Sequence, residues 1–171
     1  GQRYGTGFNA WLTDNGIAQA TKLKEFLADK NIEVVYSSPL KRATDTAKIA
    51  VNNPNIDIII DDRLIESAFG FWYSNNEEKQ KRVIDNFNRI KSCLDDILIN
   101  DTHSNIAIAS HGGVTRALCW ACGEEIGEIK HCECFHFTLD NGNWKFIERF
   151  DTKIEGPNEY LEACKLQQTH D

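Results

Sequence analysis

Methionine is absent from the 171-residue sequence, proline occurs only three times, and long apolar runs are missing. Because a helix that crosses a bilayer needs about 18 or more consecutive apolar residues, nothing here predicts a transmembrane segment. Basic residues are also scarce, since 19 Lys and Arg face 26 Asp and Glu and leave a net charge of −7. Such an acidic chain is poorly suited to bind nucleic acid or an anionic membrane, so neither is an expected partner.

Cysteine is sparse, at six positions, well below the density of a small domain held together by disulfides. Cys93, Cys119 and Cys122 fall within apolar helical patterns, where a free thiol packs as a small hydrophobic group. The segment 119–134 holds enough Cys and His donors for zinc, yet it lacks the turn residues that wrap a zinc knuckle. We therefore expect reduced core thiols, no metal site and a cytoplasmic location.

The remaining composition, 41% hydrophobic and 26% charged, is that of a soluble globular protein. A chain of this length buries roughly 70% of its unfolded surface, which is enough for one core without disulfide or metal support. We expect a single domain over residues 1–171.

Helix-like and strand-like segments alternate along the chain, a pattern typical of an α/β domain with a largely parallel sheet. An Asn-Gly pair between alternating apolar residues also favours a β-hairpin near the end of the chain. The predicted helices cover 13–30, 39–51, 77–99 and 114–122, and the predicted strands cover 34–36, 56–60, 106–109 and the two arms of a hairpin over 135–147.

Capping and periodicity support the first predicted helix. Thr13 is a natural N-cap, and Ile17, Ala20, Leu23 and Leu27 form an apolar stripe at helical spacing. We expect this stripe to face the core.

Polar side chains follow the three predicted parallel strands. Arg42 comes after the first strand, Glu66 after the second and His111 after the third. In an open parallel sheet, ligands bind at the carboxyl ends of the strands, so these three residues are expected to meet at one site.

These residues have the chemistry of a phosphate site. His111 is followed by Gly112 and Gly113, so backbone N–H groups at a helix N-terminus and the imidazole can donate to one anion. Arg42 offers a planar fork for phosphate oxygens. Glu66 beside two positive groups is suited to passing a proton to a leaving oxygen.

Each residue taken alone has a plainer interpretation. His111 could be a hydrogen-bonded structural histidine, and Arg42 and Glu66 could be solvated surface residues. Ser38 and Ser110, at strand-to-helix junctions, are interpreted as helix caps rather than ligands. The prediction of a site depends on the equivalent placement of the first three residues at the ends of separate strands.

Four segments, in this order, resemble motifs of the histidine phosphatase superfamily, which includes the cofactor-dependent phosphoglycerate mutases. They are LTDNGIAQA at 12–20, SSPLKRATDTA at 37–47, RLIE with FGFW at 63–72, and SHGG at 110–113. The order and register hold from about residue 12 to 120, which makes the four together far more specific than any one of them.

The resemblance implies a three-layer α/β/α sandwich with a mostly parallel central sheet, like that of phosphoglycerate mutase. It also implies catalysis through a phosphohistidine, with Arg42 and His111 holding the phosphoryl group and Glu66 donating a proton to the leaving oxygen. Neither a cofactor nor a metal is expected, because cationic side chains stabilise the charge.

The sequence departs from the family pattern because it contains no Arg-His-Gly, the triplet that supplies the nucleophilic histidine. Gly1 is interpreted as the glycine of that triplet, with the first strand and the nucleophile just upstream. Arg3 would then be a third phosphate-binding side chain beside Arg42 and His111, with the N–H of Gly112 as a further ligand. Alternatively, Arg3 is a loose terminal residue.

A phosphomonoester hydrolase is the expected function. Only 44 residues, 67–110, separate Glu66 from His111, whereas mutases of this resemblance usually carry a longer insertion that closes over the substrate. A mutase-type phosphotransferase and a catalytically dead phosphate-binding protein are the alternatives. The expected substrate is a phosphorylated small molecule or a phosphoprotein, and the aromatic side chains of 69–73 either line its pocket or belong to the core.

Overall fold

The structure is a computed structural model that describes residues 11–66 and 77–155. Arg3, the aromatic segment 69–73 and the tail after residue 155 lie outside the described residues, so the predictions made for them are not addressed by it. The elements along the described chain are α1 (Asp14–Leu27), β1 (Val34–Ser37), α2 (Lys41–Val51), β2 (Asp57–Ile60), the 3-10 helix η1 (Asp62–Leu64), α3 (Glu77–Asn100), β3 (Ile106–Ala109), α4 (Gly112–Ala121), β4 (Cys134–Asp140) and β5 (Asn143–Phe150).

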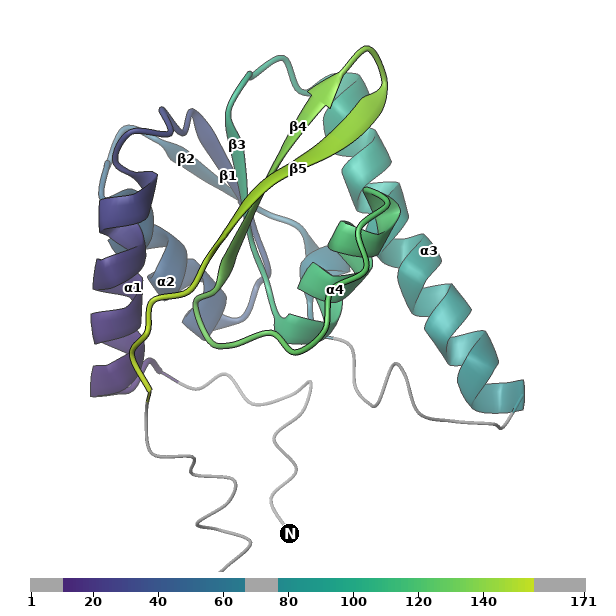
Figure 1. Ribbon diagram of the computed structural model, residues 1–171, viewed down its shortest axis with the longest axis horizontal. Helices are drawn as coiled ribbons and strands as arrows, with labels where there is room; N and C mark the ends of the chain where they lie inside the picture. The colour runs from purple at the N-terminus through teal and green to yellow at the C-terminus, as the bar shows by residue number, and fades with distance from the viewer. Residues whose placement is uncertain (1–10, 67–76, 156–171) are drawn as a thin grey trace, which may run out of the picture.

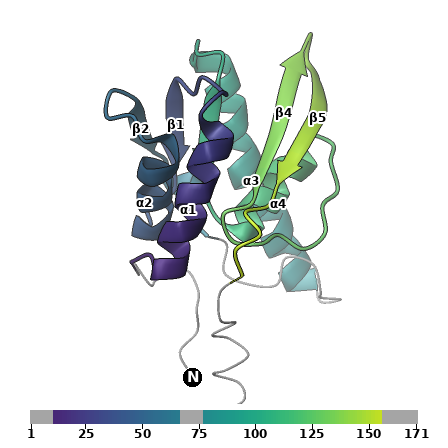
Figure 2. The same ribbon diagram turned by 60° about the vertical axis from the view of Figure 1, so that its left-hand side comes forward.

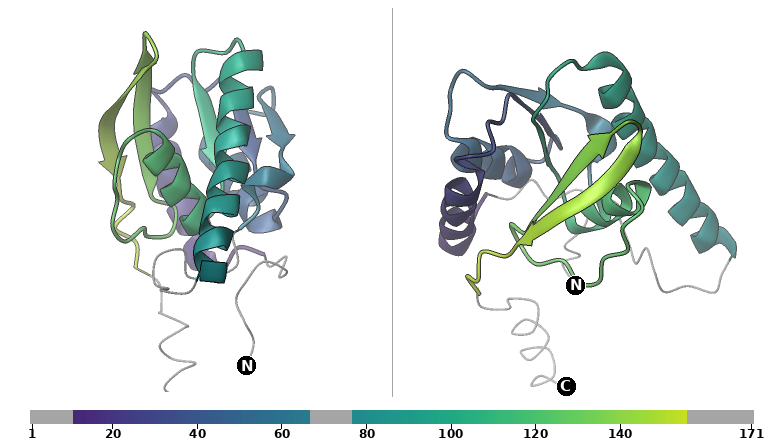
Figure 3. Two further views of the ribbon diagram at one scale, coloured as in Figure 1. Left: turned by 90° about the vertical axis from the view of Figure 1, so that its right-hand side faces the viewer. Right: turned by 45° about the horizontal axis from the view of Figure 1, so that its top comes forward.

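A parallel sheet of order β2-β1-β3 forms the centre of the molecule (Figure 1). In its register Ser37, at the end of β1, lies level with Ile60 and Ala109, so all three strands end at the same edge. In the left panel of Figure 3, α3 and α4 lie in front of the sheet and α1 and α2 lie behind it. The predicted α/β/α architecture with a parallel sheet is therefore confirmed.

The hairpin β4–β5 lies beside this sheet and is antiparallel, as the Asn-Gly pair predicts (Figure 2). Asn141 and Gly142 take φ values of 49° and 79°, which are the left-handed conformations that a two-residue hairpin loop requires. Asp140 pairs with Asn143 across this loop.

Helix α1 begins as predicted, but it ends earlier and buries a different set of residues. The Thr13 hydroxyl accepts a hydrogen bond from the Gly16 N–H at 3.1 Å, which confirms the N-cap. The helix ends at Leu27 rather than at residue 30. Its predicted stripe is wrong at Ile17, which is 45% exposed, whereas Gln19 is buried because its amide donates to the Ile154 carbonyl at 2.9 Å.

The main core lies between the sheet and the pair α3 and α4. Its fully packed members come from η1, α3 and α4, and half-buried side chains of β1 and β3 close it from the sheet side. The buried members are Leu64, Ile90, Cys93, Ile97, Val114 and Ala117. The predicted helix over 77–99 is thus confirmed, and the core fixes both the loop after β2 and the start of α4.

The flanking strands of the parallel sheet are less buried than their apolar sequences suggest. Ile59 and Ile60 of β2 are 41% and 49% exposed, and all four residues of β3 are half-buried. Both strands lie at the edges of the described parallel sheet, where one side lacks a flanking strand. Hydrophobicity alone does not distinguish an edge strand from a central one.

Candidate active site

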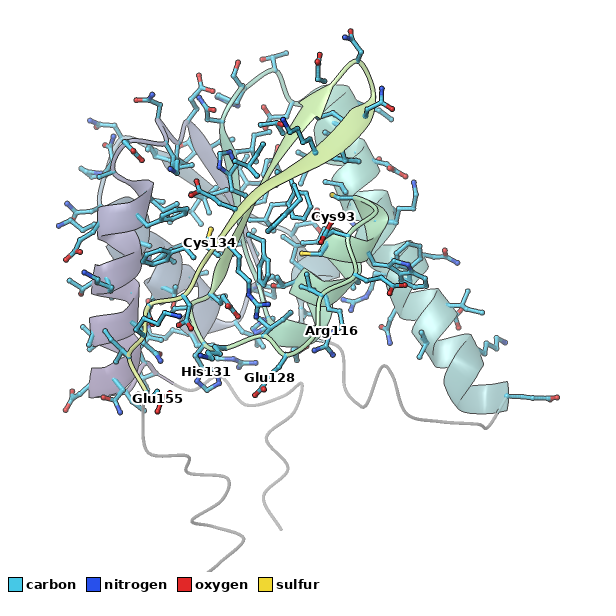
Figure 4. The ribbon with its side chains drawn as sticks, in the orientation of Figure 1. Cys93, Arg116, Glu128, His131, Cys134 and Glu155 are labelled. Atoms are coloured by element: carbon cyan, nitrogen blue, oxygen red, sulfur yellow. The ribbon has the colours of Figure 1, made fainter. Side chains whose placement is uncertain are left out.

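The predicted site residues lie at the end of the molecule where β1 and β3 finish and α2 and α4 begin, the lower end in Figure 1. The backbone N–H of Ser38 bonds to the Ala109 carbonyl at 2.9 Å, so the loops after β1 and β3 run side by side. Glu128 and His131, from the loop between α4 and β4, lie at this same end in Figure 4.

His111 is the N-cap of α4 and is only 8% exposed. Its Nε2 lies 2.8 Å from the Ser38 hydroxyl oxygen, which itself accepts from the Leu40 N–H at 3.3 Å. Because Ser38 uses a lone pair there, its proton can go to Nε2, an arrangement that favours the tautomer protonated at Nδ1. Burial, and then the charge of Arg42, lower the pKa of His111 to about 4, so the ring is neutral at pH 7.

Arg42 occupies the first turn of α2, which begins at Lys41, two residues after Pro39. Burial lowers the pKa of its guanidinium, and the nearby charge of Glu66 opposes this effect. Arg42 therefore interacts electrostatically with both other predicted catalytic residues, His111 and Glu66.

Glu66 follows η1 and is half-buried. The chain before it is held at two points. The Ser110 hydroxyl donates to the Leu64 carbonyl at 2.8 Å, and the Arg89 guanidinium donates through both terminal nitrogens to the Ile65 carbonyl at 3.2 Å. Leu64 itself is fully buried, so the backbone that carries Glu66 is fixed to the core, to α3 and to the end of β3.

Gly112 is the first residue of α4 and is exposed. The first helical hydrogen bond runs from the Thr115 N–H to the His111 carbonyl at 2.7 Å, so the N–H groups of 112–114 precede the intrahelical ladder. A Cβ built on Gly112 would meet nothing within 4 Å in the described residues. Backbone N–H groups that precede the ladder at a helix start can bind an oxyanion, and the absence of a side chain at Gly112 leaves room for one to approach.

The structure thus brings Arg42, Glu66 and His111 together and places the helix start at Gly112 beside them. Sequence reasoning missed three side chains that organise this site. The sequence predicts Ser38 and Ser110 as helix caps, and Arg89 lies in no motif that marks it as part of a site.

The remaining polar residues after β2 have a structural function. Arg63 binds both carboxylate oxygens of Asp61, at 3.0 Å through Nε and 2.7 Å through Nη2, and reaches Asp96 on α3. The Arg63 guanidinium holds the pKa of Asp61 below its usual range. These contacts join the loop after β2 to α3.

The five cysteines within the described residues are free thiols, with Cys93 and Cys119 buried and Cys122, Cys132 and Cys134 half-buried. Burial raises the pKa of Cys93 and Cys119 to about 12, so both remain protonated. Within residues 11–66 and 77–155, no group of three or more His, Cys, Asp or Glu side chains is arranged to hold a metal. The helices described there include none that is long and apolar enough to cross a membrane.

Comparison with known proteins gives one family match. The sequence profile of the histidine phosphatase superfamily (branch 1) matches residues 1–86. Phosphoserine phosphatase 1 of Hydrogenobacter thermophilus is 26% identical over 160 residues, which cover 80% of this chain and 74% of that protein. The 2,3-bisphosphoglycerate-dependent phosphoglycerate mutase of Thermoplasma acidophilum is 44% identical over 62 residues, which cover 36% of this chain but only 31% of that protein.

Solved structures show the same fold. The alpha-ribazole phosphatase of Shigella flexneri superposes with a TM-score of 0.72 at 18% identity and covers 91% of each chain. The phosphoserine phosphatase of Entamoeba histolytica, solved with 3-phosphoglyceric acid, has a TM-score of 0.68 at 19% identity and covers 86% of this chain and 88% of its own.

Proposed function

The chain belongs to the histidine phosphatase superfamily (branch 1), and from this premise we propose that it hydrolyses phosphomonoesters through a phosphohistidine intermediate. The observation that carries the proposal is the cluster of Arg42, Glu66 and His111, which follow three different strands and in which Arg42 interacts electrostatically with both Glu66 and His111. The nucleophilic histidine is expected directly before Gly1, in the Arg-His-Gly triplet that the family resemblance implies.

In the first step, the nucleophilic nitrogen attacks phosphorus and the bond from phosphorus to the ester oxygen breaks. The electron pair stays on that oxygen, and Glu66 gives its proton to it, so that the alcohol leaves neutral. Arg42 binds two phosphoryl oxygens with its planar fork, while His111 and the N–H groups at Gly112 donate to the oxygens on which negative charge develops. Arg3 is proposed as a further phosphate ligand.

In the second step, water attacks the phosphohistidine. The Glu66 carboxylate takes a proton from this water as the oxygen bonds to phosphorus and the N–P bond breaks. Inorganic phosphate leaves, the histidine returns to its neutral form and Glu66 is again protonated. His111 contributes as a neutral donor throughout, since the depressed pKa of about 4 keeps the buried ring uncharged at pH 7.

The phosphoserine phosphatase similarity supports a small phosphorylated metabolite as the substrate class. The phosphoglycerate mutase similarity keeps a phosphotransferase as the second candidate, although that match covers only 31% of the mutase. The two differ in the acceptor of the phosphoryl group, which is water in the hydrolase and a substrate hydroxyl in the mutase.

Kinetics of the full-length protein with phosphoserine, phenyl phosphate and 3-phosphoglycerate test the proposal. We expect phosphate release, a loss of about 100-fold or more in kcat for His111→Ala, and a larger loss on phosphoserine than on phenyl phosphate for Glu66→Gln. Isomerisation of phosphoglycerate without phosphate release would favour the mutase. An unchanged rate for His111→Ala would contradict the assignment of the site.

A further inference from the structure

We propose that Arg89, in the middle of α3, is a positioning residue that holds the Glu66 carboxyl group toward the leaving oxygen. This inference rests on the proposed role of Glu66 as the proton donor. Arg89 is not part of any motif in the sequence, and its connection to the site appears only in three dimensions.

The contact that carries the inference is a forked one. Nη1 and Nη2 of Arg89 both lie 3.2 Å from the carbonyl oxygen of Ile65, the residue directly before Glu66. Nη2 also lies 3.4 Å from the Asn86 side-chain oxygen, one turn earlier on α3. A planar guanidinium held on two sides in this way fixes the Ile65 peptide group, and with it the direction in which the Glu66 side chain leaves the backbone.

Charge adds to this geometry. Burial lowers the pKa of Arg89, and the carboxylate of Glu66 opposes that effect, so the two groups are close enough to interact. Arg42 on α2 interacts with the same carboxylate. Glu66 therefore faces one guanidinium from α2 and one from α3, which limits the positions its carboxylate can take.

Helix α3 can serve as a rigid support because it is anchored along its length. Ile90, the neighbour of Arg89, is fully buried in the main core together with Cys93 one turn later. Through the Ile65 carbonyl, Arg89 therefore fixes the backbone before Glu66 relative to α3. The Ser110 hydroxyl, at the end of β3, fixes the same segment by donating to the Leu64 carbonyl at 2.8 Å.

The test compares Arg89→Gln with Lys91→Gln in the full-length protein. Lys91 also lies on α3 and carries the same charge, but it pairs with Asp95 at the exposed face, so it is a matched control for net charge and helix stability. On phosphoserine, whose leaving alkoxide needs a proton, we expect Arg89→Gln to lower kcat by about tenfold or more with little change in KM. On phenyl phosphate the loss should be smaller, and Lys91→Gln should lose neither activity.

Arg89→Lys separates charge from geometry. It keeps the positive charge but replaces the planar fork with a single ammonium group, so we expect it to restore only part of the phosphoserine activity. Equal losses on both substrates in Arg89→Gln, or a rise in KM with kcat unchanged, would overturn the inference, because Arg89 would then act on the fold or on substrate binding.

A second measurement does not require turnover. With glutamate labelled with ¹³C at the carboxyl carbon, NMR titration gives the pKa of Glu66, which interacts electrostatically with Arg42 and Arg89. Loss of the Arg89 charge should raise that pKa in Arg89→Gln and leave it unchanged in Lys91→Gln. An unchanged Glu66 titration would overturn the inference. A wild-type protein without activity but with this shift would refute the proposed hydrolase and leave the contact between Arg89 and Glu66 established.

Discussion

At the scale of single residues, burial and neighbouring charges set the pKa values of the site side chains. His111 is buried and bound to Ser38, while Arg42 and Glu66 offset each other's charge beside it. Residue chemistry and position after the strands predicted that these three residues would lie close together, and the electrostatic interactions of Arg42 with the other two agree with that placement. Ser38 and Ser110 could not be distinguished from helix caps in the sequence, because a serine hydroxyl at such a junction can bond either to the local backbone or to a distant group.

Because the buried His111 ring is neutral, the free energy of unfolding should depend on pH. Its pKa is about 4 in the folded protein and about 6.5 in the unfolded chain, so the unfolded chain binds more protons between these values. Stability should therefore fall as the pH drops from about 6.5 to 4, and at pH 4.5 the group should contribute a loss of about 2 kcal/mol. Urea denaturation at pH 7 and pH 4.5 should show this loss in the wild type and a smaller one in His111→Gln. Identical pH dependence in both proteins would contradict the buried, neutral ring.

Gly112 offers a test of the oxyanion site that leaves the fold unchanged. Because an added Cβ would meet nothing within 4 Å, Gly112→Ala should fold normally and gain up to about 1 kcal/mol from reduced backbone freedom in the unfolded state. The same methyl group would stand where a phosphoryl oxygen is proposed to bind, so kcat/KM should fall. Thermal unfolding and phosphate-release kinetics measure both effects. Full activity in a stabilised variant would exclude this position from the phosphate site.

At the scale of helices and strands, local signals predicted where α1 and α3 begin. α1 has a cap at Thr13 and α3 has a sustained apolar stripe, and both begin where expected. The misplaced Ile17 shows where such reasoning fails. Periodicity counts apolar residues, but Gln19 takes the buried position because a carbonyl from residue 154, 135 positions away, satisfies its amide. Contacts of that range leave no local pattern.

Removing the cap of α1 should affect stability but not catalysis. Thr13→Ala deletes the hydroxyl that accepts from Gly16 at 3.1 Å and should cost about 1 kcal/mol. Thr21→Ala is a matched control, since its hydroxyl bonds back to the Ile17 carbonyl within the helix and its loss should be nearly neutral. Urea denaturation measures the difference. Equal free energies of unfolding for both variants would mean that the cap does not stabilise α1.

At the scale of the whole molecule, the layers place the proposed chemistry at one end of the sheet and the structural ion pairs of Arg63 farther along α3. Within the described residues, β3 pairs with β1 on one side, and β4 pairs with β5 on one side, so each has a second edge that could accept a strand. We propose that the single domain includes a first strand before residue 1 that pairs with β3. Its carboxyl end would then lie beside Ser110 and His111, where the nucleophile is needed.

The most direct test is to trap the phosphorylated enzyme. The full-length protein is mixed briefly with phosphoserine, quenched at alkaline pH to preserve phosphohistidine, and analysed by intact mass and peptide mapping. The proposed mechanism predicts an adduct of one phosphoryl group on the histidine directly before Gly1. With phenyl phosphate, whose leaving group needs little protonation, this adduct should accumulate further in Glu66→Gln, where the attacking water has lost its base. Phosphate release with no such adduct, or an adduct on another residue, would contradict the mechanism.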